Sequence, residues 1–156
     1  MPELLESILT QEYKNYEIVI TEDGSPQRDE IRRIVNEYSH KYKEIIKYYE
    51  NSENLGYDAN YRRLFELASG EYCLFMGNDD LMCEGALQTV DRVINENPNV
   101  GVIVRSYADF RGDKKNINQI YKYFNTEVCL PPGAEAISVA FRRSVIGAGM
   151  VYHRKS

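Results

Sequence analysis

The sequence comprises 156 residues, a length typical of one domain and sufficient for a hydrophobic core. Apolar residues make up 43% of it and charged residues 28%, and the formal net charge is -5 with acids and bases interspersed. No dense Lys/Arg run is present, which argues against nucleic acid as a partner. No apolar stretch reaches the ~18 residues of a membrane span, and no signal peptide is visible. The three cysteines have no paired spacing, which is typical of reduced thiols in a cytoplasmic protein and argues against a zinc site.

Apolar periodicity predicts that strands and helices alternate along the chain. The expected helices lie at residues 4–9, 26–38, 57–68, 86–94 and 137–145, and the expected strands at 16–21, 44–49, 72–76, 100–104 and 148–153. Ser25 is expected to cap the second helix, with Pro26 at its first position. The continuous apolar run 72–76 is typical of a strand buried on both faces. Residues 109–132 are expected to form a long loop with a short helical turn near 116–123. The alternation indicates an α/β fold, a mostly parallel sheet with helices on both faces.

Two acidic clusters each come directly after a predicted strand. Glu22-Asp23-Gly24-Ser25 follows the strand at 16–21, and Gly77-Asn78-Asp79-Asp80 follows the strand at 72–76. Ligands of open α/β sheets bind outside the carboxyl ends of the strands. We therefore expect Asp23, Asp79 and Asp80 to line one crevice at the carboxyl edge of the sheet.

The residue types in these clusters suit a metal ion and a polar ligand. Asp23 can accept hydrogen bonds from an N–H or from ribose hydroxyls, although an Asp-Gly-Ser turn also occurs without any ligand. Asp79 and Asp80 repel each other unless a cation or a donor neutralises them, and carboxylate oxygens suit Mg²⁺ or Mn²⁺. A loop that caps the next helix is the alternative. The polar segment 51–60 opens a helix and is expected to turn backbone N–H groups to the same crevice, or to be an Asn-rich cap.

Two stretches of the chain resemble the nucleotide-binding half of family-2 glycosyltransferases. They are SILTQEYKNYEIVITEDGS (residues 7–25) and ENLGYDANYRRLFELASGEYCLFMGNDDLMCEGAL (residues 53–87), and the resemblance extends over residues 3–108. It implies a fold of the GT-A type, a Rossmann-like α/β sandwich. It further implies that residues 1–156 form a single partial domain, with 1–108 as the nucleotide-sugar-binding half and 109–156 as the start of the acceptor half.

The resemblance also assigns roles to residues. The family's acidic pair that contacts base and ribose matches Glu22 and Asp23, and its DxD-like motif, which binds the divalent metal and the donor's ribose and diphosphate, matches residues 77–80. The metal ligands implied are Asp79 and Asp80. The nucleotide-sugar-binding residues expected on this basis are Glu22, Asp23, Ser25, Asn54, Gly56, Asn60, Asn78 and Asp79.

Three features depart from the family pattern. Gly77 stands where the common form of the motif has Asp. The family begins with a strand that precedes the opening helix, and this sequence opens at the helix. The family's catalytic base is an acidic residue in the acceptor half, and no Asp or Glu follows Glu135. The base is therefore expected beyond residue 156, with Asp109 and Glu135 as the alternatives. The chain is interpreted as a fragment that is poorly stable and inactive alone.

The function implied is metal-dependent transfer of a sugar from a UDP- or dTDP-sugar to a saccharide or lipid-linked acceptor, with inversion, in bacterial cell-surface polysaccharide synthesis. The expected location is the cytoplasm, with peripheral association at the inner face of the membrane. A non-catalytic fragment or pseudoenzyme with residual nucleotide binding is the alternative. A phospho-acceptor signalling domain would need a Lys after the fifth strand, where Arg105-Ser106 stand instead.

Overall fold

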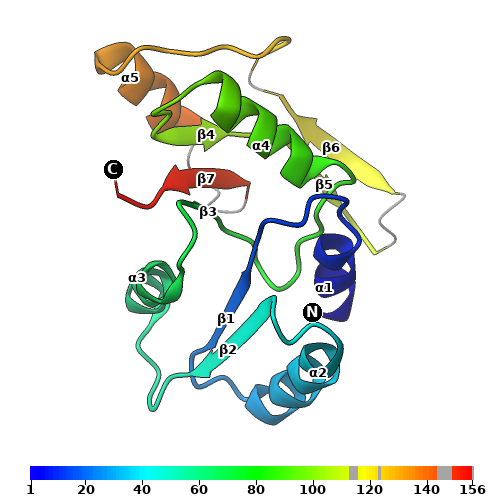
Figure 1. Ribbon diagram of the computed structural model, residues 1–156. Coiled ribbons are helices and arrows are strands. Elements are labelled where there is room, and N and C mark those ends of the chain that lie inside the picture. The colour runs from blue at the N-terminus through cyan, green and yellow to red at the C-terminus, as the bar shows by residue number, and fades with distance from the viewer. Residues whose placement is uncertain (113–115, 123, 144–148, 156) are drawn as a thin grey trace.

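The computed structural model describes residues 1–112, 116–122, 124–143 and 149–155 (Figure 1). Helices and strands alternate up to β4, as the apolar periodicity predicts. In chain order the elements are α1 (Pro2–Leu9), β1 (Ile18–Glu22), α2 (Arg28–Lys41), β2 (Ile46–Glu50), α3 (Tyr57–Leu67), β3 (Tyr72–Leu74), α4 (Ala86–Glu96), β4 (Val102–Val104), β5 (Tyr107–Phe110), β6 (Ile117–Tyr121), α5 (Ala134–Arg143) and β7 (Met150–His153). Within these described residues, no helix has both the length and the apolarity to cross a bilayer.

The main core lies around the parallel pair of β1 and β2. The register runs from Ile18 opposite Ile46 to Glu22 opposite Glu50, so the carboxyl ends of both strands meet at one edge. Apolar residues of α1 and α2 pack against this pair, and Figure 1 shows both helices beside it. Leu5 of α1 and Val35 of α2 are almost completely buried. This burial holds the loops that follow β1 and β2 in fixed positions.

The second sheet is antiparallel, so the expectation of one mostly parallel sheet is wrong. β7 lies between β3 and β4 and runs antiparallel to both. Met150 and Val151 are 4% and 1% exposed, and the Tyr152 ring meets Phe65 and Phe75 edge-on. Burial of these side chains holds the last strand at this position. Parallel pairing among the described strands is confined to β1 and β2.

A β-hairpin occupies the first part of the long loop expected at residues 109–132, and the described residues between β6 and α5 form neither helix nor strand, as expected. β5 and β6 pair antiparallel, and the rings of Tyr107 and Tyr121 stack across the strands at 4.5 Å. A cross-strand aromatic pair stabilises such a hairpin, and local sequence statistics do not show which residues will be paired. The helical turn expected near 116–123 is therefore wrong, because residues 117–121 are extended.

The second helix begins later than the sequence predicts. α2 starts at Arg28, and no side chain caps it. The backbone carbonyl of Ser25 instead accepts a hydrogen bond from the Arg28 N–H at 3.2 Å, so residues 25–27 form a turn that precedes the helix. The assignment of Ser25 as cap and Pro26 as first helical residue is wrong by two positions. The ends of the expected elements at Val145 and Ala148 lie outside the described residues.

A large cavity adjoins both β1 and β3. It measures about 1000 Å³, and its lining includes Ile20 of β1, Leu74 of β3 and Met76, which follows β3. The three residues of β3 are half-buried, so the expectation of a strand buried on both faces is wrong. The reason is that this cavity adjoins the strand.

Candidate functional site

Asp23 lies at the carboxyl end of β1 and is held by three donors. Its Oδ1 accepts hydrogen bonds from Asn51 Nδ2 and from the Leu55 N–H, both at 2.8 Å, and its Oδ2 accepts one from the Gly56 N–H at 3.0 Å. The Leu55 N–H contributes most to lowering the pKa of this carboxyl, and Asn51 and Gly56 add to the effect. The carboxylate is therefore ionised and fixed in direction, and it retains unused acceptor capacity.

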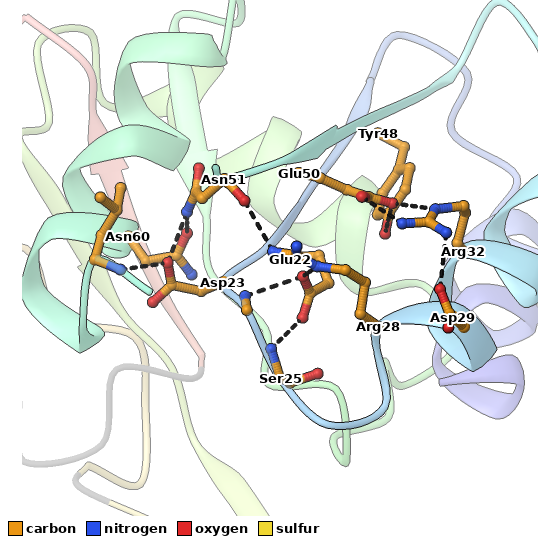
Figure 2. A network of polar contacts seen from close by, with 12 residues as sticks. Glu22, Asp23, Ser25, Arg28, Asp29, Arg32, Tyr48, Glu50, Asn51 and Asn60 are labelled. Atoms are coloured by element: carbon orange, nitrogen blue, oxygen red, sulfur yellow. Dashed lines mark hydrogen bonds and ion pairs between the residues drawn. The ribbon is translucent and has the colours of Figure 1, made fainter. Parts of the chain in front are cut away.

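Asn51 connects the elements around Asp23. It is 7% exposed, and its Nδ2 donates both to Asp23 and to Asn60 Oδ1, the latter at 3.0 Å. Its backbone N–H donates to the carbonyl of Glu22 at 2.9 Å. Figure 2 shows the Asn51 amide directed at both Asp23 and Asn60. Sequence reasoning did not single out Asn51, although it follows β2 as Asp23 follows β1.

Glu22 is buried and holds the loop rather than facing the cavity with free oxygens. It is 3% exposed, and its carboxylate accepts hydrogen bonds from the Gly24 N–H at 3.0 Å, the Ser25 N–H at 2.6 Å and Arg28 Nε at 2.5 Å. Burial opposes ionisation, but these donors, with Arg28 foremost, outweigh it and lower the pKa of Glu22 to about 2. Direct contact between Glu22 and a nucleotide stays a prediction. Its visible contribution is to shape the turn that carries Asp23 (Figure 2).

Asn54 and Gly56 act on the site through the same turn. Gly56 has φ 80° and precedes α3, and its N–H is shared between Asp23 and Asn54 Oδ1. A Cβ atom at Gly24 would lie 3.3 Å from the backbone nitrogen of Asn54, so the two loops approach closely. Gly24 itself has φ 73°, a conformation that favours glycine.

The second acidic cluster brings two carboxylates over Gly77. A Cβ atom there would lie 2.7 Å from Asp79 Oδ1 and 2.9 Å from Asp80 Oδ2. The Gly77 N–H donates to Asp80 Oδ2 at 2.7 Å. No hydrogen bond or ion pair joins Asp79 to any residue that the structure describes. The absence of a side chain at Gly77 therefore leaves space in which both carboxylates converge.

This arrangement fits a divalent cation bound together with a substrate phosphate. Mg²⁺ is commonly held by one or two carboxylates plus phosphate and water oxygens, and Mn²⁺ accepts the same hard ligands. Asp79 and Asp80 provide two such carboxylates, and Asn78 adds an amide oxygen next to them in sequence. The described part of the chain contains no cluster of three or more His, Cys, Asp or Glu residues that could hold a metal alone.

Ser7 of α1 and Gln11, two residues beyond the end of α1, anchor the segment that follows Asp80. Gln11 is 3% exposed, and its Nε2 donates to the carbonyl of Cys83 at 3.0 Å. Ser7 Oγ accepts a hydrogen bond from the Met82 N–H, also at 3.0 Å. These contacts join positions more than 70 residues apart, so no local pattern predicts them. They make α1 part of the support of the second cluster.

The structure does not show one crevice lined by Asp23, Asp79 and Asp80, but two cavities that share lining residues. The 1000 Å³ cavity is lined by residues from both clusters, including Asp23 and Asn78. A second cavity of about 260 Å³ is lined by Gly77 and Asp80, and Asn60 lines both. The structure therefore brings Asp23 and Asn78 to one space and Asp80 to the next. Glu22 and Ser25 also line the large cavity, whereas Asn54, Gly56 and Asp79 line neither.

Fold and site together define an α/β protein with acidic loops at the ends of two strands. The chain belongs to glycosyl transferase family 2, whose sequence profile matches residues 1–142. The match extends well past residue 108, where the resemblance was expected to fade. Family membership implies a GT-A, Rossmann-like α/β fold. This structure has helices and sheets as that fold requires, but its sheets are small and partly antiparallel.

Several curated proteins are similar to this chain. Abequosyltransferase RfbV of Salmonella typhimurium is 30% identical over 100 residues, which cover 64% of this chain and 30% of that protein. The minor teichoic acid biosynthesis protein GgaB of Bacillus subtilis is 29% identical over 133 residues, 82% of this chain and 14% of that protein. GalNAc(5)-diNAcBac-PP-undecaprenol beta-1,3-glucosyltransferase of Campylobacter jejuni is 32% identical over 93 residues, 59% of this chain and 29% of that protein. The chain thus spans less than a third of the length of each.

Proposed function

We propose that this protein transfers a sugar from a nucleoside-diphosphate sugar to a saccharide or lipid-linked acceptor in cell-surface polysaccharide synthesis. The observation that carries the proposal is the position of Asn60, which lines both the cavity that Asp23 lines and the cavity that Asp80 lines. Two adjoining acidic sites of different character suit a ligand with a nucleoside at one end and a diphosphate at the other.

The first loop is proposed to bind the nucleoside. Asp23 is ionised and fixed by Asn51, Leu55 and Gly56, so its remaining lone pairs are in place to accept hydrogen bonds from ribose hydroxyls or a base N–H. Ser25 lines the same cavity and adds a hydroxyl. Glu22, Asn54 and Gly56 support this loop. UDP is the nucleotide that we propose first and dTDP the second.

The second loop is proposed to hold the divalent cation and the diphosphate, with Asp79 and Asp80 as protein ligands and Asn78 beside them. The cation would neutralise the negative charge that the leaving diphosphate gains when its bond to the sugar breaks. The Gly77 N–H positions the Asp80 carboxylate, and the contacts of Ser7 and Gln11 with Met82 and Cys83 hold the segment that follows it. The proposed outcome at the anomeric carbon is inversion through in-line attack.

The acceptor hydroxyl requires a general base, and neither candidate within the chain lies at the two cavities. Asp109 lies on β5 and accepts a hydrogen bond from Asn118 at 3.0 Å, and Glu135 lies in the first turn of α5. Neither lines either cavity. We therefore assign no base among these residues. The position of both candidates away from the cavities is consistent with the proposal that residues 1–108 form the donor-binding half.

The acceptor and the location are proposed from the relatives. The name of the Campylobacter jejuni relative specifies an undecaprenol-linked acceptor, and that of the Bacillus subtilis relative specifies teichoic acid. A lipid-linked acceptor would require the protein to work at the inner face of a bacterial membrane while its nucleotide-sugar donor comes from the cytoplasm.

Calorimetry with the full-length protein tests the proposal. UDP and dTDP are titrated with Mn²⁺, with Mg²⁺ and with a chelator, and binding is expected only when a metal is present. Equal binding with and without metal would refute the role given to Asp79 and Asp80. A panel of nucleotide-sugars is then screened for turnover. Metal-dependent binding without any turnover or hydrolysis would favour the pseudoenzyme alternative.

A further inference from the structure

The smaller of the two cavities has one aromatic wall and one polar wall. It lies between α3 and the end of β3, which face each other in Figure 1. Its volume of about 260 Å³ is below the ~300–1,000 Å³ of pockets for drug-sized ligands, so it suits a single sugar ring rather than a whole nucleotide. The lining residues are Tyr57, Asn60, Tyr61, Leu64, Phe75, Met76, Gly77 and Asp80.

A stack of aromatic rings forms the apolar wall. The Tyr61 ring lies 3.9 Å from that of Phe75 with an interplanar angle of 16°, and Phe65 packs against Phe75 at 4.7 Å. Tyr57, one helical turn before Tyr61, stacks on it at 5.8 Å and 27°. The inner rings are therefore fixed, and they hold the outer ring in a defined direction.

Tyr57 is the exposed end of this stack. It is 77% exposed, although the rings beneath it are packed. Its ring therefore offers an apolar face at the mouth of a cavity, a position from which it can cover a ligand that enters. Asn60 and Asp80 lie on the same cavity and can pair with hydroxyl groups.

We propose that this cavity is the subsite for the donor's sugar ring, with Tyr57 and Tyr61 against an apolar face of the ring and Asn60 and Asp80 at its hydroxyls. The proposal rests on the proposed function, because a diphosphate held at Asp79 and Asp80 places the attached sugar beside Asp80.

The apolar lining also selects the class of sugar. Leu64, Phe75 and Met76 have no side-chain groups that could pair with a hydroxyl, and a hydroxyl buried without a partner is unfavourable. A methyl group would instead gain apolar contacts there. The subsite therefore favours a sugar that carries a methyl group, as a 6-deoxy or an N-acetyl substituent, over a fully hydroxylated hexose.

Calorimetry with the full-length protein and Mn²⁺ tests the subsite with matched probes. UDP is compared with UDP-glucose and UDP-N-acetylglucosamine, and dTDP with dTDP-glucose and dTDP-rhamnose. In the series of the nucleotide that binds, the methyl-bearing sugar is expected to bind more tightly than glucose. Tyr57→Ala is expected to weaken binding of that nucleotide-sugar about tenfold, the size of one lost aromatic contact, and to leave the free diphosphate unchanged.

Two further variants control the experiment. Tyr57→Phe keeps the ring and is expected to retain wild-type affinity. Asp58→Ala changes the neighbouring exposed residue, which does not line the cavity, and is expected to leave the ratio of the two affinities unchanged. Because Tyr57 is exposed, its replacement is expected to leave the melting temperature of the protein unchanged.

The outcomes separate this proposal from the proposed function. If Tyr57→Ala weakens the free diphosphate and the nucleotide-sugar equally, the ring contacts the base and the subsite is refuted. The subsite is also refuted if the variant binds both as the wild type does, or if glucose and the methyl-bearing sugar bind alike. Metal-dependent binding of the diphosphate in these cases leaves the proposed function intact. If neither UDP, dTDP nor their sugars bind with metal, both proposals fail.

Discussion

The two acidic loops of the site differ in how many protein groups bind their carboxylates. Asp23 accepts hydrogen bonds from three donors, and neighbouring Glu22 accepts them from two backbone N–H groups and Arg28. In the second loop, Asp80 accepts one from Gly77 N–H, and Asp79 accepts none from the described residues. Protein donors thus hold the carboxylates of the first loop in place. The carboxylates of the second loop have few such donors, and we expect a bound cation to fix their positions.

This difference indicates that the two loops recognise different parts of the ligand. A carboxylate fixed by several N–H groups has a defined direction before any ligand arrives, which suits recognition of a nucleoside. Adjacent carboxylates with few partners repel each other, and a divalent cation relieves that repulsion. Variants in the second loop, at Asp79 or Asp80, should therefore change the metal dependence of the protein. Variants in the first loop should change its stability and its affinity for the nucleotide.

The largest effect is expected for Asp80→Asn. The variant keeps an oxygen that can accept the Gly77 N–H but removes the charge, so turnover should fall by about 10²–10³-fold and respond little to Mn²⁺. Initial rates across a Mn²⁺ titration measure this. Asp29→Asn is the control, because the Asp29 side chain is 93% exposed and lines neither cavity. If Asp80→Asn responded to Mn²⁺ as the wild type does, the assignment of cation binding to the second loop would be wrong.

Asn51→Ala is expected to break the first loop. It removes the amide that joins Asp23 to Asn60 and leaves both partners near the protein interior with fewer donors, at a cost of about 1–3 kcal/mol in the free energy of unfolding. Urea denaturation measures the change, and calorimetry should show weaker nucleotide binding with the metal dependence intact. Asn118→Ala is the control, because Asn118 is exposed, its Nδ2 donates to Asp109 on β5, and it lines neither cavity. Equal losses for the two variants would argue against Asn51 as the connecting residue.

Glu22 should make the first loop sensitive to acid. Its pKa is lowered from 4.5 to about 2, so its contribution to stability is complete above about pH 4.5 and is lost as the pH falls toward 2. That contribution is on the order of 1–2 kcal/mol, allowing for solvent beside Arg28. Urea unfolding at pH 7, 4.5, 3 and 2 should show a shallower pH dependence for Glu22→Gln. The same slope in variant and wild type would show that other carboxylates account for the acid sensitivity.

The smallest effect is expected for Glu50→Gln, at the end of β2 directly opposite Glu22. Glu50 forms a bidentate pair with Arg32, and its pKa is likewise lowered to about 2, chiefly by Arg32. The pair is exposed, however, and exposed ion pairs contribute little. The urea midpoint of Glu50→Gln at pH 7 should stay within error of the wild type. A loss as large as that of Glu22→Gln would show that burial is not what distinguishes the two pairs.

The sequence predicts those parts of this molecule that depend on local pattern. The apolar spacing of Tyr57, Tyr61 and Leu64 predicts α3, which the structure confirms at Tyr57–Leu67. The apolar run after residue 71 predicts β3. Both acidic clusters were identified because each follows a strand.

The rest depends on contacts between distant residues. Asn51 and Gln11 are ordinary polar residues in the sequence, and their importance arises only when β1 lies beside β2 and when α1 lies beside the segment after Asp80. The β5–β6 hairpin was missed because its stability comes from pairs such as Tyr107 and Tyr121. β7 was expected as a strand, but its antiparallel position between β3 and β4 depends on packing that no local pattern contains.

The two hydrogen bonds of the Asn51 amide have a consequence for how this site can evolve. One NH₂ group serves an oxygen of Asp23 and an oxygen of Asn60 at the same time, so both partners must be acceptors. A change at position 51 to a residue without two donors would leave Asn60 Oδ1 without a donor among the described residues and Asp23 Oδ1 with the Leu55 N–H alone. A change at 23 or 60 to a donor would place donor against donor. We therefore expect positions 23, 51 and 60 to vary together across relatives, with a substitution at one tolerated only where the other two have already adapted.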